Sequence, residues 1–336
     1  MASCKHGPNG MKVLLTGASG FVGSHILDSL LAQNVATAVL LRASSDRQFL
    51  QHHLPALEVR AGSIDNIDSL NQALAGITHV IHCAGCTRAR RNSEFHEVNH
   101  IGTQNVVTTV NSHQGDVQRL VYVSSLAASG PAIAAKPARE SDSPKPVSTY
   151  GTSKLAGELE VANNCRSDYA ILRPPAVYGP RDYGFLSMFK AINAHVLPKP
   201  TGRQSLSLVF VKDLAEAVVR CLEHPKASAK TYFVASREIV TAEMMAREIA
   251  SQMNRWTLPC PLPAALLWPV CFFEQVRSQF CGKPSLLNLQ KFAELRAPGW
   301  VCDASRLAHE VGFECKTTLK QGVAESLKWY LQEGWL

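Results

Sequence analysis

A glycine-rich stretch near the start of the chain restricts its fold more than any other feature of the sequence. Residues 16–23 read T-G-A-S-G-F-V-G, between an apolar run and a helical pattern. Gly17 allows a tight strand-to-helix turn, Gly20 allows close approach of a pyrophosphate, and Gly23 lets the helix lie against the strand. An ordinary strand-turn-helix is the alternative, but the flanking segments favour a dinucleotide site at a helix N-terminus. The expected cofactor contacts here are Gly17, Ser19, Gly20, Phe21, Val22 and Gly23.

Strand-like apolar runs and helical patterns alternate along the first half of the chain. Such alternation is typical of a parallel sheet that binds its ligand at the carboxyl ends of the strands. We therefore predict an α/β fold: a Rossmann doubly wound parallel sheet with a smaller C-terminal substrate-binding domain. The expected dinucleotide-binding domain covers residues 11–180 with returning strands at about 205–235, and residues 181–204 and 236–336 form the smaller substrate-binding or lid region. Expected helices include 21–31, 65–75, 94–111 and 150–162.

Composition excludes several other classes of protein. The formal net charge of +7 suits an anionic ligand, but the densest basic cluster, residues 88–91, is too short to indicate nucleic-acid binding. Among ten cysteines only Cys83 and Cys86 form a C-x-x-C pair, so we expect buried free thiols and no metal site. No apolar run reaches the ~18 residues of a membrane span, and residues 1–10 do not resemble a signal peptide. We expect a cytoplasmic protein.

Residues 258–273 are apolar but contain four prolines. We interpret this segment as a lid or core flap of the smaller domain. The alternative is a partly exposed apolar surface that meets a hydrophobic substrate or makes weak contact with a membrane face.

A tyrosine and a lysine stand four residues apart at the start of a helical pattern, in Y-G-T-S-K (residues 150–154). Positions i and i+4 share a helix face, so the phenol of Tyr150 and the ammonium of Lys154 are expected side by side. A nearby cation lowers the pKa of a phenol, which makes Tyr150 a candidate general acid or base. Ser124 and Ser125 follow an expected strand, where a hydroxyl can bind a substrate carbonyl. A surface pair and turn-forming serines are the alternatives when each motif is taken alone.

Taken in order, these motifs resemble the extended short-chain dehydrogenase/reductases, the NAD-dependent epimerase/dehydratase superfamily. The resemblance covers almost the whole chain. Besides residues 16–23, it rests on H-C-A-G (82–85), N-x-x-G-T (99–103), S-S (124–125), Y-G-T-S-K (150–154) and L-R-P-P-A-V-Y-G-P (172–180). The late G-W-V-C-D-A-S-R (299–306) and the closing W-Y-L-Q-E-G-W-L are most similar to 3β-hydroxysteroid dehydrogenase and dihydroflavonol-reductase-like members.

The resemblance implies four catalytic residues. Tyr150 looks like the acid/base, and Lys154 like the residue that lowers its pKa and holds the nicotinamide ribose. Ser125, five residues before Gly130, looks like the carbonyl-binding hydroxyl, with Ser124 as the less favoured twin. Asn99 resembles the asparagine that supports a proton relay through water. Further cofactor contacts implied are Ser63, where the family more often has aspartate, together with Ile64, Ala84, Gly85, Pro174, Ala176 and Val177.

Arg42 bears on the choice of cofactor. It follows the second expected strand, where NAD-binding sheets usually carry an acidic residue for the ribose 2′-hydroxyl. An arginine pairs instead with a 2′-phosphate, so we predict NADP, with Arg47 as a helper and NAD as the alternative.

Two departures from the family's patterns bear on the reaction. Dehydratases of this family carry an Asp-Glu pair where this chain has Leu126-Ala127, and nucleotide-sugar epimerases often carry an arginine where it has Leu206. We therefore expect hydride transfer between NADP(H) and a ketone or secondary alcohol on a largely apolar, steroid-, flavonoid- or alkyl-like molecule. A sugar epimerase is the first alternative, and a non-catalytic NADP-binding sensor or scaffold is the second. The helical patterns 94–111 and 150–162 resemble the family's dimer interface, so we expect a homodimer.

Overall fold

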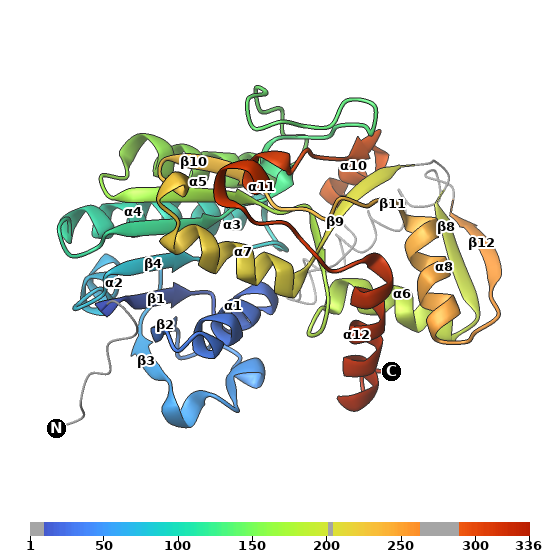
Figure 1. The fold of residues 1–336 in the computed structure, drawn as a ribbon, viewed down its shortest axis with the longest axis horizontal. Coiled ribbons are helices and arrows are strands. Elements are labelled where there is room, and N and C mark those ends of the chain that lie inside the picture. The colour runs from blue at the N-terminus through green and yellow to red at the C-terminus, as the bar shows by residue number, and fades with distance from the viewer. Residues whose placement is uncertain (1–9, 201–203, 263–288) are drawn as a thin grey trace.

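A sheet of seven parallel strands forms the larger part of the molecule (Figure 1). The computed structural model describes residues 10–200, 204–262 and 289–336. The strand order is β10-β6-β5-β4-β1-β2-β3, which reverses direction between β1 and β4. The predicted Rossmann fold is confirmed. The strands are β1 (Lys12–Thr16), β2 (Ala36–Leu41), β3 (Glu58–Ala61), β4 (His79–His82), β5 (Arg119–Val123), β6 (Asp168–Arg173) and β10 (Lys230–Phe233).

Helices cover both faces of this sheet. Val13 and Leu15 of β1 pack on one face against α1 and α7, whereas Leu14 points to the other face, towards α4 and α5. Successive side chains of a strand alternate between faces, which explains why β1 is apolar throughout. On the first face lie α1 (Phe21–Ala32) and α7 (Val211–Glu223). The elements on the other face, with the short turns nearby, are α2 (Ile67–Ala73), α3 (Asn92–His96), η4 (Glu97–Ile101), α4 (Gly102–Ser112), η5 (Leu126–Ala128) and α5 (Thr149–Asn164).

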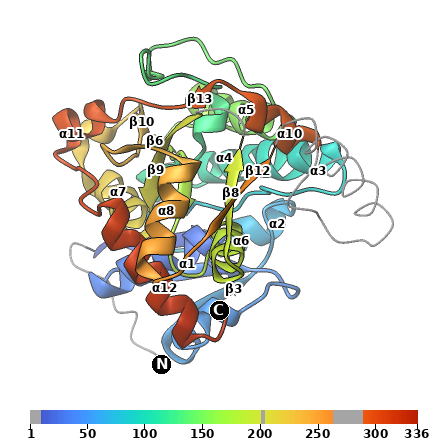
Figure 2. The same cartoon turned by 90° about the vertical axis from the view of Figure 1, so that its right-hand side faces the viewer.

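A second, smaller part lies beyond the carboxyl ends of the strands, with a four-stranded sheet and a two-stranded sheet (Figure 2). Its strands are β7 (Ala176–Tyr178), β9 (Ser205–Phe210), β11 (Ile239–Thr241) and β13 (Gly299–Trp300), and the pair β8 (Val196–Pro200) and β12 (Leu258–Leu262). Its helices are α6 (Tyr183–Asn193), α8 (Ala242–Gln252), α10 (Leu289–Arg296) and α12 (Leu319–Gln332). Helix α11 (Ser305–Val311) packs near β10, and the remaining short turns are η2 (Gln48–Leu50), η3 (Leu54–Ala56) and η6 (Pro225–Ala227).

Two sequence expectations differ from this arrangement, and a third falls mostly outside the described residues. Of the expected returning strands, β10 joins the seven-stranded sheet, but β9 does not. It pairs instead with β7, which follows β6 after Pro174 and Pro175, two residues that have no N–H to continue the β6 ladder. The helix expected over 94–111 is interrupted by the π-helical turn η4. In the apolar segment 258–273, β12 ends at Leu262 and the rest lies outside the described residues.

No helix in the described parts of the chain is long and apolar enough to cross a membrane.

The glycine turn between β1 and α1 is shaped by two different steric requirements. Gly17 has φ +76°, and a Cβ atom there would lie 2.6 Å from the backbone nitrogen of Ala84. A Cβ atom on Gly23 would lie 2.0 Å from the Gly17 carbonyl oxygen, so α1 approaches the turn too closely for any side chain. At Gly20, by contrast, the nearest atom would be an ordinary 3.4 Å away. The fold therefore requires glycine at positions 17 and 23, whereas the space beside Gly20 is open.

This difference predicts a large loss of stability for one of two matched substitutions and a small loss for the other. Gly23→Ala should lower the free energy of unfolding by about 1–3 kcal/mol or more, because the added methyl group overlaps backbone. Gly20→Ala should cost less than about 1 kcal/mol, since Gly20 has an extended conformation open to alanine (φ −82°, ψ 173°). Urea denaturation of both variants measures the difference. Equal destabilisation would contradict the packing role of Gly23.

Candidate active site

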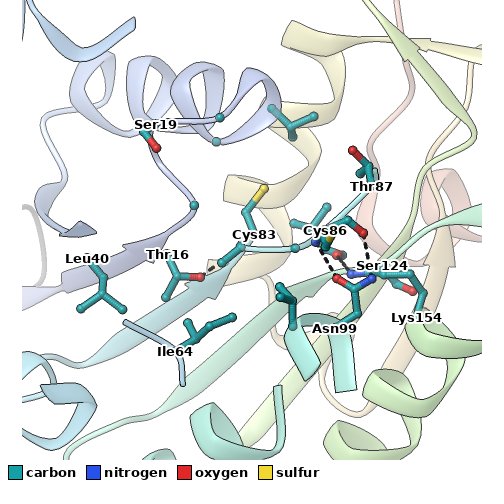
Figure 3. A pocket seen from close by; sticks show the side chains of 18 of the residues that line it. Thr16, Ser19, Leu40, Ile64, Cys83, Cys86, Thr87, Asn99, Ser124 and Lys154 are labelled. Carbon is teal, nitrogen blue, oxygen red and sulfur yellow. Dashed lines mark hydrogen bonds between the residues drawn. The ribbon is translucent and has the colours of Figure 1, made fainter. Parts of the chain in front are cut away.

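A cleft of about 750 Å³ opens at the carboxyl ends of β1 and β4, where the strand order reverses. Figure 3 shows Ser19 towards one end of this cleft, and Asn99, Ser124 and Lys154 gathered at the other. Such a crevice is where open α/β sheets bind dinucleotides. Of the residues that the sequence predicted as cofactor contacts or catalytic groups, those that line it are Gly17, Ser19, Gly20, Phe21, Val22, Gly23, Arg42, Ser63, Ile64, Ala84, Gly85, Asn99, Ser125, Tyr150, Lys154, Pro174 and Val177.

Ala176 does not line the cleft, although the sequence predicted a cofactor contact there. It precedes Val177 in β7, and neighbouring strand residues point to opposite sides. Because Val177 faces the cleft, Ala176 turns away from it and is exposed. Arg47 is also absent from the lining.

The first turn of α1 borders one end of the cleft and has the features of a phosphate site. Gly20 precedes the helix, and no side chain caps its N-terminus. The first N–H groups of an α-helix have no partner within the helix, and the helix dipole favours negative charge beside them. A pyrophosphate seated beside Gly20 fits both the electrostatics and the free space.

Arg42 and Asp65 line the cleft after the ends of β2 and β3. Arg42 follows β2, and its backbone N–H donates to the Ser45 hydroxyl at 3.0 Å, which holds the turn. Both Arg42 and Ser45 line the cleft. Asp65 lines it too, two residues after Ser63, and sequence reasoning missed it. The only signal was a carboxylate close to the position where the family more often has an aspartate.

Lys154 is buried beneath the opposite end of the cleft, with 4% of its surface exposed. Its Nζ donates to the Val123 carbonyl oxygen at 2.8 Å and lies 4.3 Å from the centre of the Tyr122 ring. Burial lowers the pKa of Lys154 below its ordinary value, although Tyr150 acts in the opposite direction. The ammonium is therefore held at one place, on the helix face that also carries Tyr150.

Tyr150 lies in the first turn of α5, next to Ser125. The two side chains share a hydrogen bond, and the Tyr150 ring lies 5.9 Å from that of Phe95. Burial raises the pKa of Tyr150 above its ordinary value, and the opposing effects of Lys154 and of the hydrogen bond to Ser125 do not cancel it. Lys154 thus acts in the expected direction, but the net shift of the pKa is upward. Tyr150 is a neutral phenol near pH 7, able to donate a proton.

The two adjacent serines have different partners. Ser124 donates its hydroxyl to the Glu158 carboxylate, which also accepts from Arg173 at 2.6 Å, and all three residues are buried. Ser125 accepts from the Ala127 backbone N–H at 3.1 Å and meets Tyr150. Ser124 is therefore tied to a buried ion pair, and Ser125 is the hydroxyl beside the Tyr150 phenol. Sequence reasoning missed this ion pair, whose signal was Glu158 four residues after Lys154 on the same helix face.

Asn99 joins the loop after β4 to helix α5. Its amide nitrogen donates to the Cys86 carbonyl and to the Ser153 hydroxyl, both at 2.9 Å, and its amide oxygen accepts from the Cys86 N–H at 2.7 Å. These bonds occupy the side chain and hold the cleft wall at Gly85 and Cys86 in place. Asn99 sits in the π-helical turn η4, a kind of interruption that often occurs at functional sites.

Comparison with known proteins agrees with this geometry. Residues 13–235 match the model of the NAD dependent epimerase/dehydratase family. A UDP-glucose 4-epimerase of Vibrio cholerae is 26% identical over 340 residues, covering 95% of each chain. A ceramide reductase of Caulobacter vibrioides is 27% identical over 325 residues, covering 96% of each. The crystal structure of a Thermus thermophilus UDP-glucose 4-epimerase in complex with NAD superimposes with a TM-score of 0.76 at 22% identity, over 96% of this chain and 99% of that one.

The finer resemblance inferred from the motifs is also confirmed. A sterol-4-α-carboxylate 3-dehydrogenase (decarboxylating) of Bos taurus is 31% identical over 231 residues, covering 65% of this chain and 62% of that protein. A putative dihydroflavonol 4-reductase of Synechocystis is 25% identical over 350 residues, covering 96% of this chain and 95% of that protein. Both epimerases and reductases are therefore among the relatives. The chain belongs to the NAD dependent epimerase/dehydratase family, as an enzyme of the extended short-chain dehydrogenase/reductase type.

Proposed function

We propose that this enzyme transfers hydride between NADP(H) and a ketone or secondary alcohol on a largely apolar small molecule. The observation that carries the proposal is the arrangement of Tyr150, Ser125 and Lys154 in the cleft. A hydrogen-bonded phenol and hydroxyl with a buried ammonium beneath them suit a carbonyl oxygen that gains negative charge.

In the direction of reduction, each of these residues has a distinct task. Ser125 donates a hydrogen bond to the substrate carbonyl oxygen, and Tyr150 donates the proton that this oxygen takes up. Lys154 stabilises the phenolate that Tyr150 leaves behind and is held for this by the Val123 carbonyl. The nicotinamide supplies the hydride when the cofactor is bound. Gly20 and the first turn of α1 would hold its pyrophosphate, and Arg42 would hold a 2′-phosphate.

Two features favour net reduction of an apolar substrate. Leu126 and Ala127 are buried directly after Ser125, so no acid/base pair stands there for an elimination. Leu206 in β9 packs with the apolar core of the second part, where a diphosphate-gripping arginine would otherwise stand. The ceramide reductase and the sterol dehydrogenase among the relatives are named for lipids, which supports the same class of substrate.

A sugar epimerase is the second candidate, favoured by the Vibrio cholerae relative. It would use the same three residues for a transient oxidation and consume no net cofactor. A non-catalytic NADP-binding protein would have no need of a buried Lys154 beside Tyr150.

We also propose a homodimer through α4 and α5, near which Ile101 and Leu159 are exposed.

Tyr150→Phe tests the role of the acid. This change should lower kcat by about 10²–10⁴-fold, because the phenol hydroxyl that delivers the proton is lost. NADPH affinity, measured by fluorescence titration, should stay nearly unchanged. Turnover equal to that of the wild type would refute the assignment.

Arg42→Ala tests the choice of cofactor. Loss of a charge-assisted hydrogen bond of about 1.5–3 kcal/mol should weaken NADPH binding roughly 10- to 100-fold and leave NADH binding within about threefold. Arg47→Ala is the matched control, since Arg47 does not line the cleft. Tighter binding of NADH than NADPH by the wild type would overturn the prediction of NADP.

Gly20→Ala tests the phosphate site separately from the fold. A methyl group there enters the space proposed for the pyrophosphate, so affinity for NADPH and for NADH should fall together by at least about tenfold. Unchanged affinity, measured by calorimetric titration, would mean that the pyrophosphate binds elsewhere.

A further inference from the structure

Helix α10 brings a carboxylate to the N-terminus of α5, the helix that carries Tyr150 and Lys154. The buried Ser148 hydroxyl accepts from the Gly151 backbone N–H at 3.1 Å and donates to the Glu294 carboxylate at 2.9 Å. The carboxylate, the hydroxyl and the first turn of α5 therefore form one hydrogen-bonded chain. It joins two residues 146 positions apart in the sequence.

This contact supplies a charge that α5 itself lacks. Its first turn contains no acidic residue, although negative charge near a helix N-terminus is stabilising. Glu294 provides that charge from the second part of the molecule. Ser148 links the carboxylate to the helix backbone, because its hydroxyl bonds both Glu294 and the Gly151 N–H.

Two side chains hold Glu294 in position. The Trp300 indole N–H donates to the Glu294 carbonyl oxygen at 3.0 Å, and the Gln204 amide donates to the carbonyl oxygens of Glu294 and Ala297, at 3.2 and 2.7 Å. The last carbonyl groups of a helix lack partners within it, so these bonds anchor the end of α10. Trp300 lies in β13 and Gln204 directly precedes β9, which ties Glu294 to the four-stranded sheet.

We propose that Glu294 is a positioning residue of the active site, which orders the end of α5 through Ser148 and places its negative charge near the Tyr150 phenol. The proposal rests on the proposed function, in which Tyr150 is the acid. Among the described residues, the groups that face Tyr150 include Lys154 on the same helix, Ser125 directly before η5, Tyr122 from β5, Phe95 from α3 and Glu294 from α10.

Among these groups Glu294 is the acidic one. Its charge raises the pKa of Tyr150, against the effect of Lys154. The second part of the molecule thereby helps keep Tyr150 protonated, the form that donates to a carbonyl oxygen.

Titration of Tyr150 in the full chain tests this directly. Tyrosine labelled with ¹³C at Cζ reports ionisation by its NMR shift, and the Tyr150 signal is the one missing from Tyr150→Phe. In Glu294→Gln, which keeps the hydrogen bond from Ser148 and removes the charge, Tyr150 should ionise at lower pH than in the wild type. Glu333→Gln, at the exposed end of α12, removes an equal charge as a control and should cause no shift.

A Tyr150 titration unchanged in Glu294→Gln would overturn the proposal. If glutamine perturbs the fold, seen as movement of the other tyrosine signals, Glu294→Asp decides instead: it keeps the charge, and Tyr150 should then ionise near the wild-type pH. An aspartate variant that ionises well below the wild type would overturn the proposal. The titration does not require turnover. If Tyr150→Phe kept wild-type turnover, the proposed function would fail, and the titration would still report whether Glu294 acts on Tyr150.

Discussion

The active site depends on the burial of the charged face of α5 against the end of β5. Lys154 and Glu158 stand one helical turn apart on that face, and each is matched by a specific partner. Lys154 meets the Val123 carbonyl and the Tyr122 ring, whereas Glu158 meets Arg173 and the Ser124 hydroxyl. A buried charge without a partner would cost several kcal/mol, on the order of 3–5 when an existing pair is broken. These partners fix the orientation in which α5 packs against β5 and β6.

Close backbone contact completes that constraint. A Cβ atom on Gly151 would lie 2.4 Å from the Ala127 carbonyl oxygen, and one on Gly157 would lie 2.5 Å from the Asn99 carbonyl oxygen. Helix α5 therefore touches both η5 and the π-helical turn at distances that only glycine permits. Because η5 begins directly after Ser125, the same contact that fixes the helix also brings Tyr150 to the serine.

The fold, and the residues that line the cleft beside the glycine turn, could be predicted from the sequence because their signals are local. The glycine turn, the apolar runs and the Tyr150–Lys154 spacing each lie within a few residues, and their meaning follows from strand or helix geometry. The Glu158–Arg173 pair and the Ser148–Glu294 contact join distant segments, which no local pattern reports. Whether Ala176 lines the cleft depends on which way the side chains of the three-residue strand β7 point. The net direction of the Tyr150 pKa depended on how far burial outweighs a neighbouring cation, and only the packed structure decides that.

Deuterium transfer from NADPH labelled at the transferable position of nicotinamide C4 tests the central claim of net hydride transfer. The wild-type enzyme would be incubated with this cofactor and a panel of sterol, flavonoid and long-chain ketones, with UDP-glucose as the sugar-nucleotide arm. Net hydride transfer predicts one deuterium at the new carbinol carbon of a ketone product for each NADPH consumed. Isomerised sugar nucleotide that carries no deuterium, formed with no loss of NADPH, would contradict it.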